Sequence, residues 1–432
     1  MKILVTGLCT LHWGRLEFGN IGNYYIIEPL FRELHRVFPL AEISTTFQMT
    51  EEFQKRENVH VLPMTLYYAW QETDLVNAMD ELASVRDGNP AKTEYIQAVR
   101  DCDLLLNVSG DMWGDNAEHV GEGRFLVDLC KMRTAQLLGV KTVLFGVTPG
   151  PFSDASTADF AKEVFSHFDL VINREPTSSA NLKEWGFDVS KTKDFACPAF
   201  LYTPRLSEAE DRELEALVGS LKTEQPFIGF TIGGFNMPVG PYDMWPRPDA
   251  QYTVFARVIE HIVNERNGKV VLISHTNGFC LPPHFQLING RDFPILKQLR
   301  EVLTKRKRIA DMGNVVLLDT PRLPAMTKAI IGKFDFMITG RVHASVAAVS
   351  QCVPAVFLTY EQSFIPSTKM SGFSSLCNLE SMVCAPSDSA GIIKRVDLCM
   401  DNREQLVSQL KTRIKEVKQL ASPAFDELET LF

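Results

Sequence analysis

A short polar turn carries the two side chains best suited to anion binding and proton transfer. Arg341 and His343 follow Gly340, between the apolar strand-length run Phe336–Thr339 and the small-residue, helix-length segment Ala344–Cys352. A guanidinium can bind a carboxylate or phosphate through two parallel hydrogen bonds, and an imidazole can transfer a proton near neutral pH. The turn therefore predicts a site that combines anion binding with acid–base chemistry.

A second apolar run, Ala355–Leu358, completes a strand–helix–strand unit around this turn. That unit places Arg341 and His343 after the carboxyl end of a buried strand and at the start of a helix, where open α/β sheets bind anionic ligands. The alternative is a structural role, with Arg341 in a surface ion pair and His343 capping a backbone carbonyl. The small and apolar neighbours of the turn favour the binding role.

Composition limits the classes of protein to be considered. The chain has 432 residues, of which 45% are hydrophobic and 22% charged, enough for two or three domains with full cores. Its net charge of −9 argues against a nucleic-acid partner, so an anionic ligand must meet a local group of cations. No apolar segment approaches the ~18 residues of a membrane span. Nine cysteines without a Cys-x-x-Cys pair predict reduced thiols in a cytoplasmic protein and no metal site.

Strands and helices are expected to alternate along the whole chain, which predicts parallel sheets covered on both faces. In the first half the expected strands are Ile3–Val5, Val59–Pro63, Leu104–Val108, Thr142–Val147 and Leu170–Asn173. In the second half they are Phe227–Ile232, Val270–Ser274, Val315–Leu318, Phe336–Thr339 and Ala355–Leu358. The fold class is therefore α/β, with two Rossmann-like domains and a C-terminal helix that covers the core.

The charged segment between Pro204 and Pro226 separates the two series of strands. We expect an N-terminal domain over residues 1–204, a linker over 205–225 and a C-terminal domain over 226–432, with a cleft between the domains. Pro29 either kinks the first helix or lies in its first turn, and the sequence leaves both possibilities open.

Further polar residues follow other strands and add to the candidate site. Asp111 and Asp115 are candidates for a base or for metal ligands, although capping of the following helix is the simpler role for both. Arg174 is a second candidate anion ligand, and the adjacent Glu175 is expected to orient it. His275 ends its own strand and is a second candidate acid.

A glycine-bearing loop after the first strand completes the set of candidate binding elements. It ends with Phe18-Gly-Asn-Ile-Gly22, and its first residues, Gly7-Leu-Cys-Thr-Leu-His12, lack the close glycine spacing of a dinucleotide-binding loop. Asn20 and Gly22 are expected to let the backbone approach a ligand.

The order of these motifs resembles the polysaccharide pyruvyl transferase family over nearly the whole chain. The matching segments are Phe18–Gly22, Ser109-Gly110, Thr148–Phe152, Arg174-Glu175, Pro198–Leu201, Gly340–His343, Val353-Pro354, Tyr360 and Lys369. The chain departs from the family pattern at Asn23 and Cys197, and it has only one glycine near Ser109.

The resemblance implies an architecture similar to the GT-B glycosyltransferases and the transfer of a pyruvyl group from phosphoenolpyruvate to a sugar. The acceptor would be a cell-surface polysaccharide or its lipid-linked precursor, bound on the N-terminal side, with the donor on the C-terminal side. The product would be a cyclic pyruvate ketal, and no cofactor beyond the donor would be required. A peripheral position at the inner membrane face and a homo-oligomer both stay open.

In this chemistry Arg341, Arg174 and Lys369 would bind the donor, with Gly340 shaping the turn. His343 would protonate the methylene carbon of the donor, and His275 or Asp111 would be the other catalytic candidates. Two alternatives remain: a GT-B glycosyltransferase that uses a nucleotide sugar, and a non-catalytic sugar-binding relative, which the departures at Asn23 and Cys197 would permit.

Overall fold

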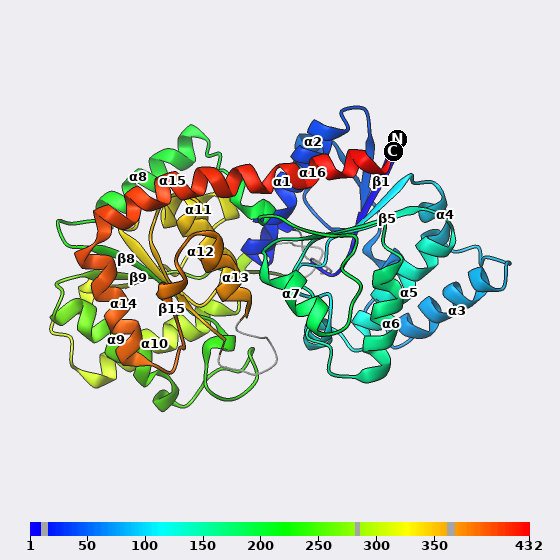
Figure 1. The fold of residues 1–432 in the computed structure, drawn as a ribbon. Coiled ribbons are helices and arrows are strands. Elements are labelled where there is room, and N and C mark those ends of the chain that lie inside the picture. Colours follow the sequence, from blue (N-terminus) through cyan, green and yellow to red (C-terminus); the bar gives the residue numbers. More distant parts are fainter. Residues whose placement is uncertain (10–15, 281–285, 361–367) are drawn as a thin grey trace. The chain divides into compact units, whose positions relative to one another are not determined.

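The chain folds into two compact α/β units in the computed structural model, which describes residues 1–9, 16–280, 286–360 and 368–432 (Figure 1). The first unit contains Met1–Leu16, Ile26–Pro198 and Gln419–Phe432. The second contains Glu17–Tyr25 and Ala199–Lys418. The expected α/β class with parallel sheets is confirmed, and each unit is described below by itself.

The first unit is built on a seven-stranded parallel sheet with the order β3-β2-β1-β4-β5-β6-β7. Its strands are β1 (Lys2–Thr6), β2 (Glu42–Thr45), β3 (Val59–Val61), β4 (Leu104–Asn107), β5 (Lys141–Val147), β6 (Leu170–Asn173) and β7 (Thr192–Asp194). The central strand β4 is buried at every position, as expected for a parallel strand covered on both faces.

Helices of the first unit cover this sheet. They are α1 (Ile21–Val37, whose first residues belong to the second unit), α2 (Glu51–Glu57), α3 (Asp74–Arg86), α4 (Glu94–Arg100), α5 (Arg124–Leu137), α6 (Ala155–Ser166), α7 (Thr177–Glu184) and α16 (Pro423–Asp426). Helices α3, α4 and α6 pack around α5 as one layer (Figure 1). Pro29 lies inside α1, beyond its first turn, which decides the question left open by the sequence.

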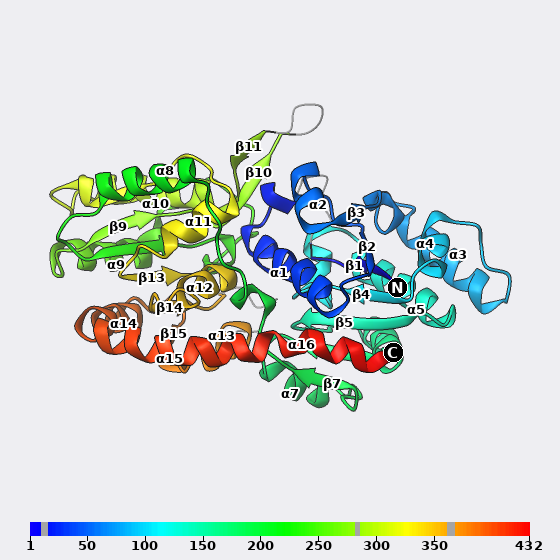
Figure 2. The ribbon, with the colours of Figure 1, turned by 90° about the horizontal axis from the view of Figure 1, so that it is seen from above.

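The second unit is built on a six-stranded parallel sheet with the order β12-β9-β8-β13-β14-β15. Its strands are β8 (Phe227–Thr231), β9 (Lys269–Leu272), β12 (Val315–Leu317), β13 (Phe336–Thr339), β14 (Ala355–Leu358) and β15 (Val383–Cys384). A separate antiparallel hairpin of β10 (Asn277–Phe279) and β11 (Leu287–Asn289) leaves the sheet edge, as Figure 2 shows.

Helices cover both faces of the second sheet. They are α8 (Glu208–Leu221), α9 (Thr253–Asn264), α10 (Asp292–Arg306), α11 (Pro324–Ile331), α12 (Val342–Val349), α13 (Thr368–Leu376), α14 (Ser389–Asp401) and α15 (Arg403–Ala421, which ends in the first unit). Helices α9, α10 and α14 pack together on one face, and α8, α11 and α12 on the other (Figure 1).

Residues 205–225, expected to be a linker, form mostly helix α8, which belongs to the second unit. The helix begins with a capping box: the Glu210 N–H donates to the Ser207 hydroxyl, and the Glu210 carboxylate accepts from the Ser207 N–H at 2.8 Å. Leu214 is the buried residue of this helix and anchors it.

The C-terminal stripe of apolar residues lies on α15, as expected. Leu410, Ile414 and Val417 are buried, whereas Leu420 is 43% exposed. Among the described residues no helix combines the length and the apolar character needed to cross a membrane.

Candidate functional site

The strand order of the second unit defines where a ligand should bind. Strand β8 lies between β9 and β13, so the connections leave its two sides in opposite directions, and open α/β sheets bind ligands at such a switch point. Gly233 follows β8, and Gly340 and Arg341 follow β13. The turn singled out from the sequence therefore lies at this switch point.

Arg341 is held there by a buried carboxylate. Its Nε atom lies 3.0 and 3.2 Å from the two carboxylate oxygens of Asp292, and its Nη2 atom donates to Oδ1 of the same group. Asp292 is fully buried, and the Arg341 side chain is 15% exposed. This charge-assisted pair fixes one edge of the planar guanidinium. The sequence did not single out Asp292, because an acidic residue in the first turn of a helix is common: it interacts favourably with the helix dipole.

The segment that follows β9 orients Asp292 in turn. The backbone N–H of His275 donates to Asp292 Oδ2 at 3.2 Å, and the Asp292 N–H donates to the hydroxyl of Thr276 at 3.0 Å. A side chain at Gly233 would place its Cβ within 2.8–2.9 Å of the Asp292 and Arg341 side chains. The glycine after β8 is thus needed to make room for the ion pair.

Asn236 ties together the loops that follow β8, β13 and β14. Its Oδ1 accepts from the Gly233 N–H at 2.9 Å, and its Nδ2 donates to the carbonyls of Gly340 at 3.3 Å and Thr359 at 3.1 Å. A Cβ at Gly340 would lie 2.1 Å from Asn236 Oδ1, so only glycine fits there. Gly340 therefore shapes the turn, as expected.

His343 lies in the first turn of α12, half-buried, against the glycine loop. A Cβ at Gly22 would lie 2.6–2.8 Å from the Cβ, Cγ and Nδ1 atoms of His343. On another side, the ring of Phe373 meets the imidazole edge-to-face at 6.1 Å between centroids. Gly22 thus lets the start of α1 approach the imidazole itself, a contact between distant parts of the sequence.

Asn20 organises the loop that brings Gly22 to this position. Its side-chain oxygen accepts from the Gly22 N–H at 3.0 Å, as N-cap asparagines do, and it pairs with Thr276 in a short antiparallel bridge. The Asn277 N–H donates to the Gly19 carbonyl at 3.0 Å. The glycine loop is therefore hydrogen-bonded to the segment after β9 that also orients Asp292.

His275 is buried beside the same ion pair. It is 2% exposed, its ring meets Tyr25 edge-to-face at 5.5 Å, and its Nε2 has no hydrogen-bond partner among the described residues. Burial, with the charges of Arg341 and Lys328, lowers the pKa of His275 to about 3. The imidazole is therefore neutral at physiological pH.

Lys328 is a buried cation that sequence analysis did not identify. Its ammonium donates to the Tyr202 carbonyl at 2.6 Å and lies 5.3 and 5.1 Å from the ring centroids of Tyr25 and Tyr202, which stack on each other. Its positive charge helps to lower the pKa of His275. The sequence signal that could have pointed to this cation is the aromatic pair Tyr24-Tyr25, which follows the glycine loop.

The buried state of His275 predicts a pH-dependent stability. Because its folded-state pKa lies below the unfolded value of ~6.5, only the unfolded chain takes up this proton between about pH 6.5 and 3, and stability falls as the pH is lowered through this window. We expect His275→Phe, which keeps the ring contact with Tyr25, to lose about 1 kcal/mol less per pH unit than the wild type. Urea unfolding at pH 7.5 and 5.5 measures this; equal pH dependence would contradict it.

The first unit has its own buried arginine at the carboxyl edge of its sheet. Arg174 follows β6, is 1% exposed and donates from Nε to the Thr148 hydroxyl at 2.9 Å. Its Nη2 lies 3.8 Å from the Asp111 carboxylate. Gly110 has a positive φ of 61°, and a Cβ there would lie 3.4 Å from Arg174 Nη1. Arg174 and Asp111 thus lie close together, as predicted from their positions after the ends of parallel strands.

Glu175 does not have the role expected for it. Its carboxylate accepts hydrogen bonds from the Thr177 N–H at 2.8 Å and from the hydroxyls of Thr177 and Ser178, at the start of α7. These contacts cap the helix, because the first-turn N–H groups have no partners within it. The acid that forms an ion pair with Arg174 is Asp111.

A second buried group of the first unit was also missed. Asp128 accepts from Asn107 Nδ2 at 2.8 Å and from the Tyr67 hydroxyl, and burial raises its pKa to about 6. Arg124 nearby donates to the Leu8 carbonyl at 2.7 Å. Both charged residues lie on the buried face of α5. The spacing of apolar residues along a helix predicts apolar side chains on that face, so these two residues were not identified from the sequence.

The last candidate, Lys369, belongs to α13, and its side chain lies outside the described part of the chain. Within the described residues no group of three or more His, Cys, Asp or Glu side chains gathers as metal ligands do. The second unit therefore brings together Arg341, Gly340, His343, His275 and the Asn20–Gly22 loop.

Comparison with solved structures places the fold. The chain is similar to HepE from Anabaena in complex with UDP and glucose, with a TM-score of 0.59 and 11% identity over 100% of this chain and 99% of that one. A glycosyltransferase from Rickettsia africae matches with a TM-score of 0.57 at 11% identity over 99% and 97% of the chains. UDP-GlcNAc 2-epimerase from Neisseria meningitidis, bound to UDP-GlcNAc, matches with a TM-score of 0.55 at 11% identity over 100% and 99%. The expected GT-B-like architecture is confirmed.

The family follows from the sequence itself. A model of the family described as polysaccharide pyruvyl transferase matches residues 20–362, a range that begins at Asn20 in the glycine loop and includes Arg174, His275, Arg341 and His343. With the strand-end glycines, the arginine and the histidine all in place, the chain belongs to the polysaccharide pyruvyl transferase family.

Proposed function

We propose that the protein transfers a pyruvyl group from phosphoenolpyruvate to a sugar of a cell-surface polysaccharide or of its lipid-linked precursor, forming a pyruvate ketal. The observation that carries the proposal is the pair Arg341 and His343 at the switch point of the second sheet, in a chain of this family. A fixed guanidinium and an adjacent imidazole match an anionic donor that must be protonated on carbon.

The reaction begins with the donor at Arg341. A proton from His343 is transferred to the methylene carbon, which leaves an oxocarbenium-like centre on the adjacent carbon. One sugar hydroxyl attacks that carbon and loses its proton. The second hydroxyl then attacks as the bond to phosphate breaks, so that phosphate leaves and the ring closes. The donor supplies the whole transferred group, so no further cofactor is required in this proposal.

The two histidines differ in their fitness for the first step. His275 is neutral and buried, with its pKa lowered to about 3. His343 is half-buried at the start of α12, two residues beyond Arg341. A bound multivalent anion would stabilise the cationic form of His343. These facts favour His343 as the acid, with His275 as a neutral neighbour that holds Asp292 through its backbone.

Arg174 and Asp111 of the first unit stay candidates for anion binding and for the base. Their ion pair at 3.8 Å holds both side chains at the edge of the first sheet. Since a base must receive protons from the sugar hydroxyls, Asp111→Asn should impair turnover more than donor binding. A cytoplasmic location, peripheral to the membrane when the acceptor is lipid-linked, and a possible homo-oligomer belong to the same proposal.

The test is direct. The full chain is incubated with phosphoenolpyruvate and a set of glycan acceptors, and phosphate release is measured beside mass spectrometry of the sugar. A ketal adds the mass of pyruvate less one water. We expect both signals to appear together and to require the acceptor. A sugar product without a pyruvyl group would reject the proposal.

Nucleotide-sugar transfer is the second candidate, because HepE, which has this fold, is described with UDP and glucose. Thermal-shift titration separates the two: phosphoenolpyruvate should raise the melting temperature, and uridine and guanosine nucleotide sugars should not. Stabilisation by a nucleotide sugar with no effect of phosphoenolpyruvate would favour the second candidate. Sugar binding without phosphate release would indicate a non-catalytic relative.

A further inference from the structure

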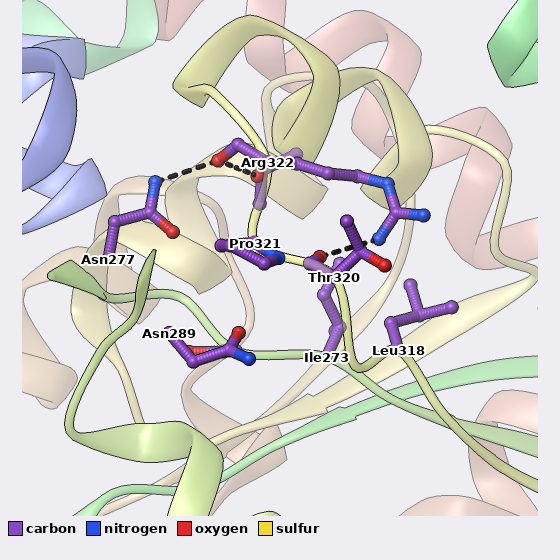
Figure 3. Close-up of a pocket in the computed structure, with 9 residues that line it drawn as sticks. Ile273, Asn277, Asn289, Leu318, Thr320, Pro321 and Arg322 are labelled. Atoms are coloured by element: carbon purple, nitrogen blue, oxygen red, sulfur yellow. Dashed lines mark hydrogen bonds between the residues drawn. The ribbon is translucent and has the colours of Figure 1, made fainter. Parts of the chain in front are cut away.

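Three segments of the second unit meet around a small pocket at the carboxyl edge of its sheet (Figure 3). They are the segment that follows β9, the β10–β11 hairpin and the loop before α11. The pocket encloses about 20 Å³, which is room for about one water molecule and not for a sugar or a nucleotide. This junction therefore joins chain segments and is too small to bind a substrate.

Two asparagines anchor the base of the hairpin at this junction. Asn277 begins β10 and Asn289 ends β11, and the two residues lie directly opposite each other. The Nδ2 atom of Asn277 donates to the Arg322 carbonyl at 2.7 Å, a bond that Figure 3 shows. The Nδ2 atom of Asn289 donates to the Asp319 carbonyl, also at 2.7 Å. Both strands of the hairpin are thus tied to the loop before α11.

The two ends of the hairpin are in close contact with each other. Before the hairpin, Ser274 Oγ donates to the Thr276 carbonyl at 2.8 Å and accepts from the Thr276 N–H at 3.3 Å. After the hairpin, a Cβ at Gly290 would lie 2.5 Å from the Thr276 carbonyl oxygen and 2.6 Å from that of Asn277, so only glycine fits there. A displacement of one end would therefore displace the other.

On one side, the segment before the hairpin supports the anion-binding arginine. The His275 N–H donates to Asp292 Oδ2 at 3.2 Å, and the Thr276 hydroxyl accepts from the Asp292 N–H at 3.0 Å. Asp292 in turn binds Arg341. Asn277 is the next residue in the chain, so the bond made by its side chain limits the movement of this whole segment.

On the other side, Asn277 supports the glycine loop that lies against the candidate acid. Its backbone N–H donates to the Gly19 carbonyl at 3.0 Å. The next residue of that loop, Asn20, accepts from the Gly22 N–H at 3.0 Å. A Cβ at Gly22 would lie 2.6 Å from the Cβ of His343. One residue is therefore linked to the surroundings of both candidate site residues.

We propose that Asn277 is a positioning residue for both Arg341 and His343, because its side chain fixes the segment that holds Asp292 on one side and the glycine loop on the other. An amide suits this role, since it donates a hydrogen bond without adding a charge. The effect on pyruvyl transfer rests on the proposed function, whereas the link from Asn277 to the two site residues does not.

Hydrogen exchange of the full chain, measured by mass spectrometry, tests this link without any substrate. Asn277→Leu keeps the approximate size and the neutral charge of the side chain but removes the donor to the Arg322 carbonyl. We expect exchange to become about five- to tenfold faster, the effect of one hydrogen bond, in peptides that contain residues 19–25, 274–278 and 289–294.

Two further variants complete this measurement. The matched control is Asn264→Leu: Asn264 Nδ2 also donates to a backbone carbonyl, that of Arg308 at 3.0 Å, but at the end of α9. It should leave exchange in the three groups of peptides unchanged. If Asn277→Leu folds poorly, Asn277→Ser replaces it, because the shorter neutral side chain weakens the same bond with less disturbance of the hairpin.

Calorimetric titration with phosphoenolpyruvate tests the consequence for the site. We expect the affinity of folded Asn277→Leu to be about five- to tenfold lower than that of the wild type. In Arg341→Lys, which lacks the planar fork that Asp292 holds, adding Asn277→Leu should change the affinity less than about twofold, because the two changes act on one interaction. A merely structural role would lower the melting temperature without this dependence on Arg341.

Unchanged exchange around either the glycine loop or Asp292 would overturn the proposal, as would wild-type donor affinity in folded Asn277→Leu or equal effects of this change with and without Arg341→Lys. Faster exchange at both places, with a loss of affinity that depends on Arg341, would support it. If the wild type binds no phosphoenolpyruvate, the proposed function fails, and the exchange result alone decides the positioning role of Asn277.

Discussion

We expect His343→Gln to lower turnover of pyruvyl transfer by about 10²–10⁴-fold while leaving phosphoenolpyruvate affinity nearly intact. Glutamine keeps a polar side chain of similar reach but cannot deliver a proton to carbon. The imidazole belongs to the residue two positions beyond Arg341 and lies against Gly22, so its position is set by neighbours that the substitution leaves in place. Turnover, donor affinity and melting temperature of the variant check this.

Two controls separate chemistry from packing. His261→Gln changes a histidine of the same unit, on α9, whose Nε2 lies 2.9 Å from the carboxylate of Asp397 on α14, and it should leave turnover unchanged. Gly22→Ala keeps the imidazole but adds a Cβ that would lie 2.6 Å from the His343 Cβ, so it should reduce turnover by displacing the ring. If His275→Gln abolishes turnover and His343→Gln does not, the acid has been assigned to the wrong histidine.

The second large effect is expected at Arg341. Arg341→Lys preserves charge but removes the planar fork that binds Asp292 through Nε and Nη2. A lysine ammonium cannot satisfy Asp292 and a donor anion in the same geometry. Since a hydrogen bond to a charged group is worth about 1.5–3 kcal/mol, donor affinity should fall roughly ten- to a hundredfold. Calorimetric titration with phosphoenolpyruvate measures this.

The matched control for Arg341 is Arg306→Lys. Arg306 also binds a carboxylate through two nitrogens, with Nε 2.5 Å and Nη2 2.9 Å from the oxygens of Glu260, but it is the last residue of α10. Its loss should lower stability without changing donor affinity. Equal donor affinity in wild type and Arg341→Lys would reject a bidentate donor clamp.

Removing the Arg341 charge altogether should affect folding as well. Arg341→Ala leaves the fully buried Asp292 without its cation, and breaking a buried pair in this way typically costs about 3–5 kcal/mol. Asp292→Asn in the same chain should recover part of that loss, because the uncompensated charge is gone. Donor affinity should not recover, which separates the structural role of Asp292 from the binding role of Arg341.

The amino-acid sequence by itself determined the class of fold and the position of the main candidates. Apolar runs of strand length bounded by glycine and polar residues are local signals, and parallel strands bring all their carboxyl ends to one edge. The placement of Arg341 and His343 after β13, and of Arg174 with Asp111 in the first unit, followed from that rule alone. The short strands β2, β7 and β15 were missed because two to four residues carry too little pattern.

Only the tertiary structure decided which residues serve the candidates. Asp292 is far from Arg341 in the chain, and nothing in its local sequence distinguishes it from an acid that complements the helix dipole. Gly22 was expected to let the backbone approach a ligand, but its close approach to His343 could not be read from the sequence. Glu175 is adjacent to Arg174 but does not pair with it: its carboxylate accepts from the Thr177 N–H and from the hydroxyls of Thr177 and Ser178 at the start of α7, where backbone N–H groups have no partner within the helix. The pKa of His275 depends on burial and on Arg341 and Lys328, which long-range packing alone brings near it.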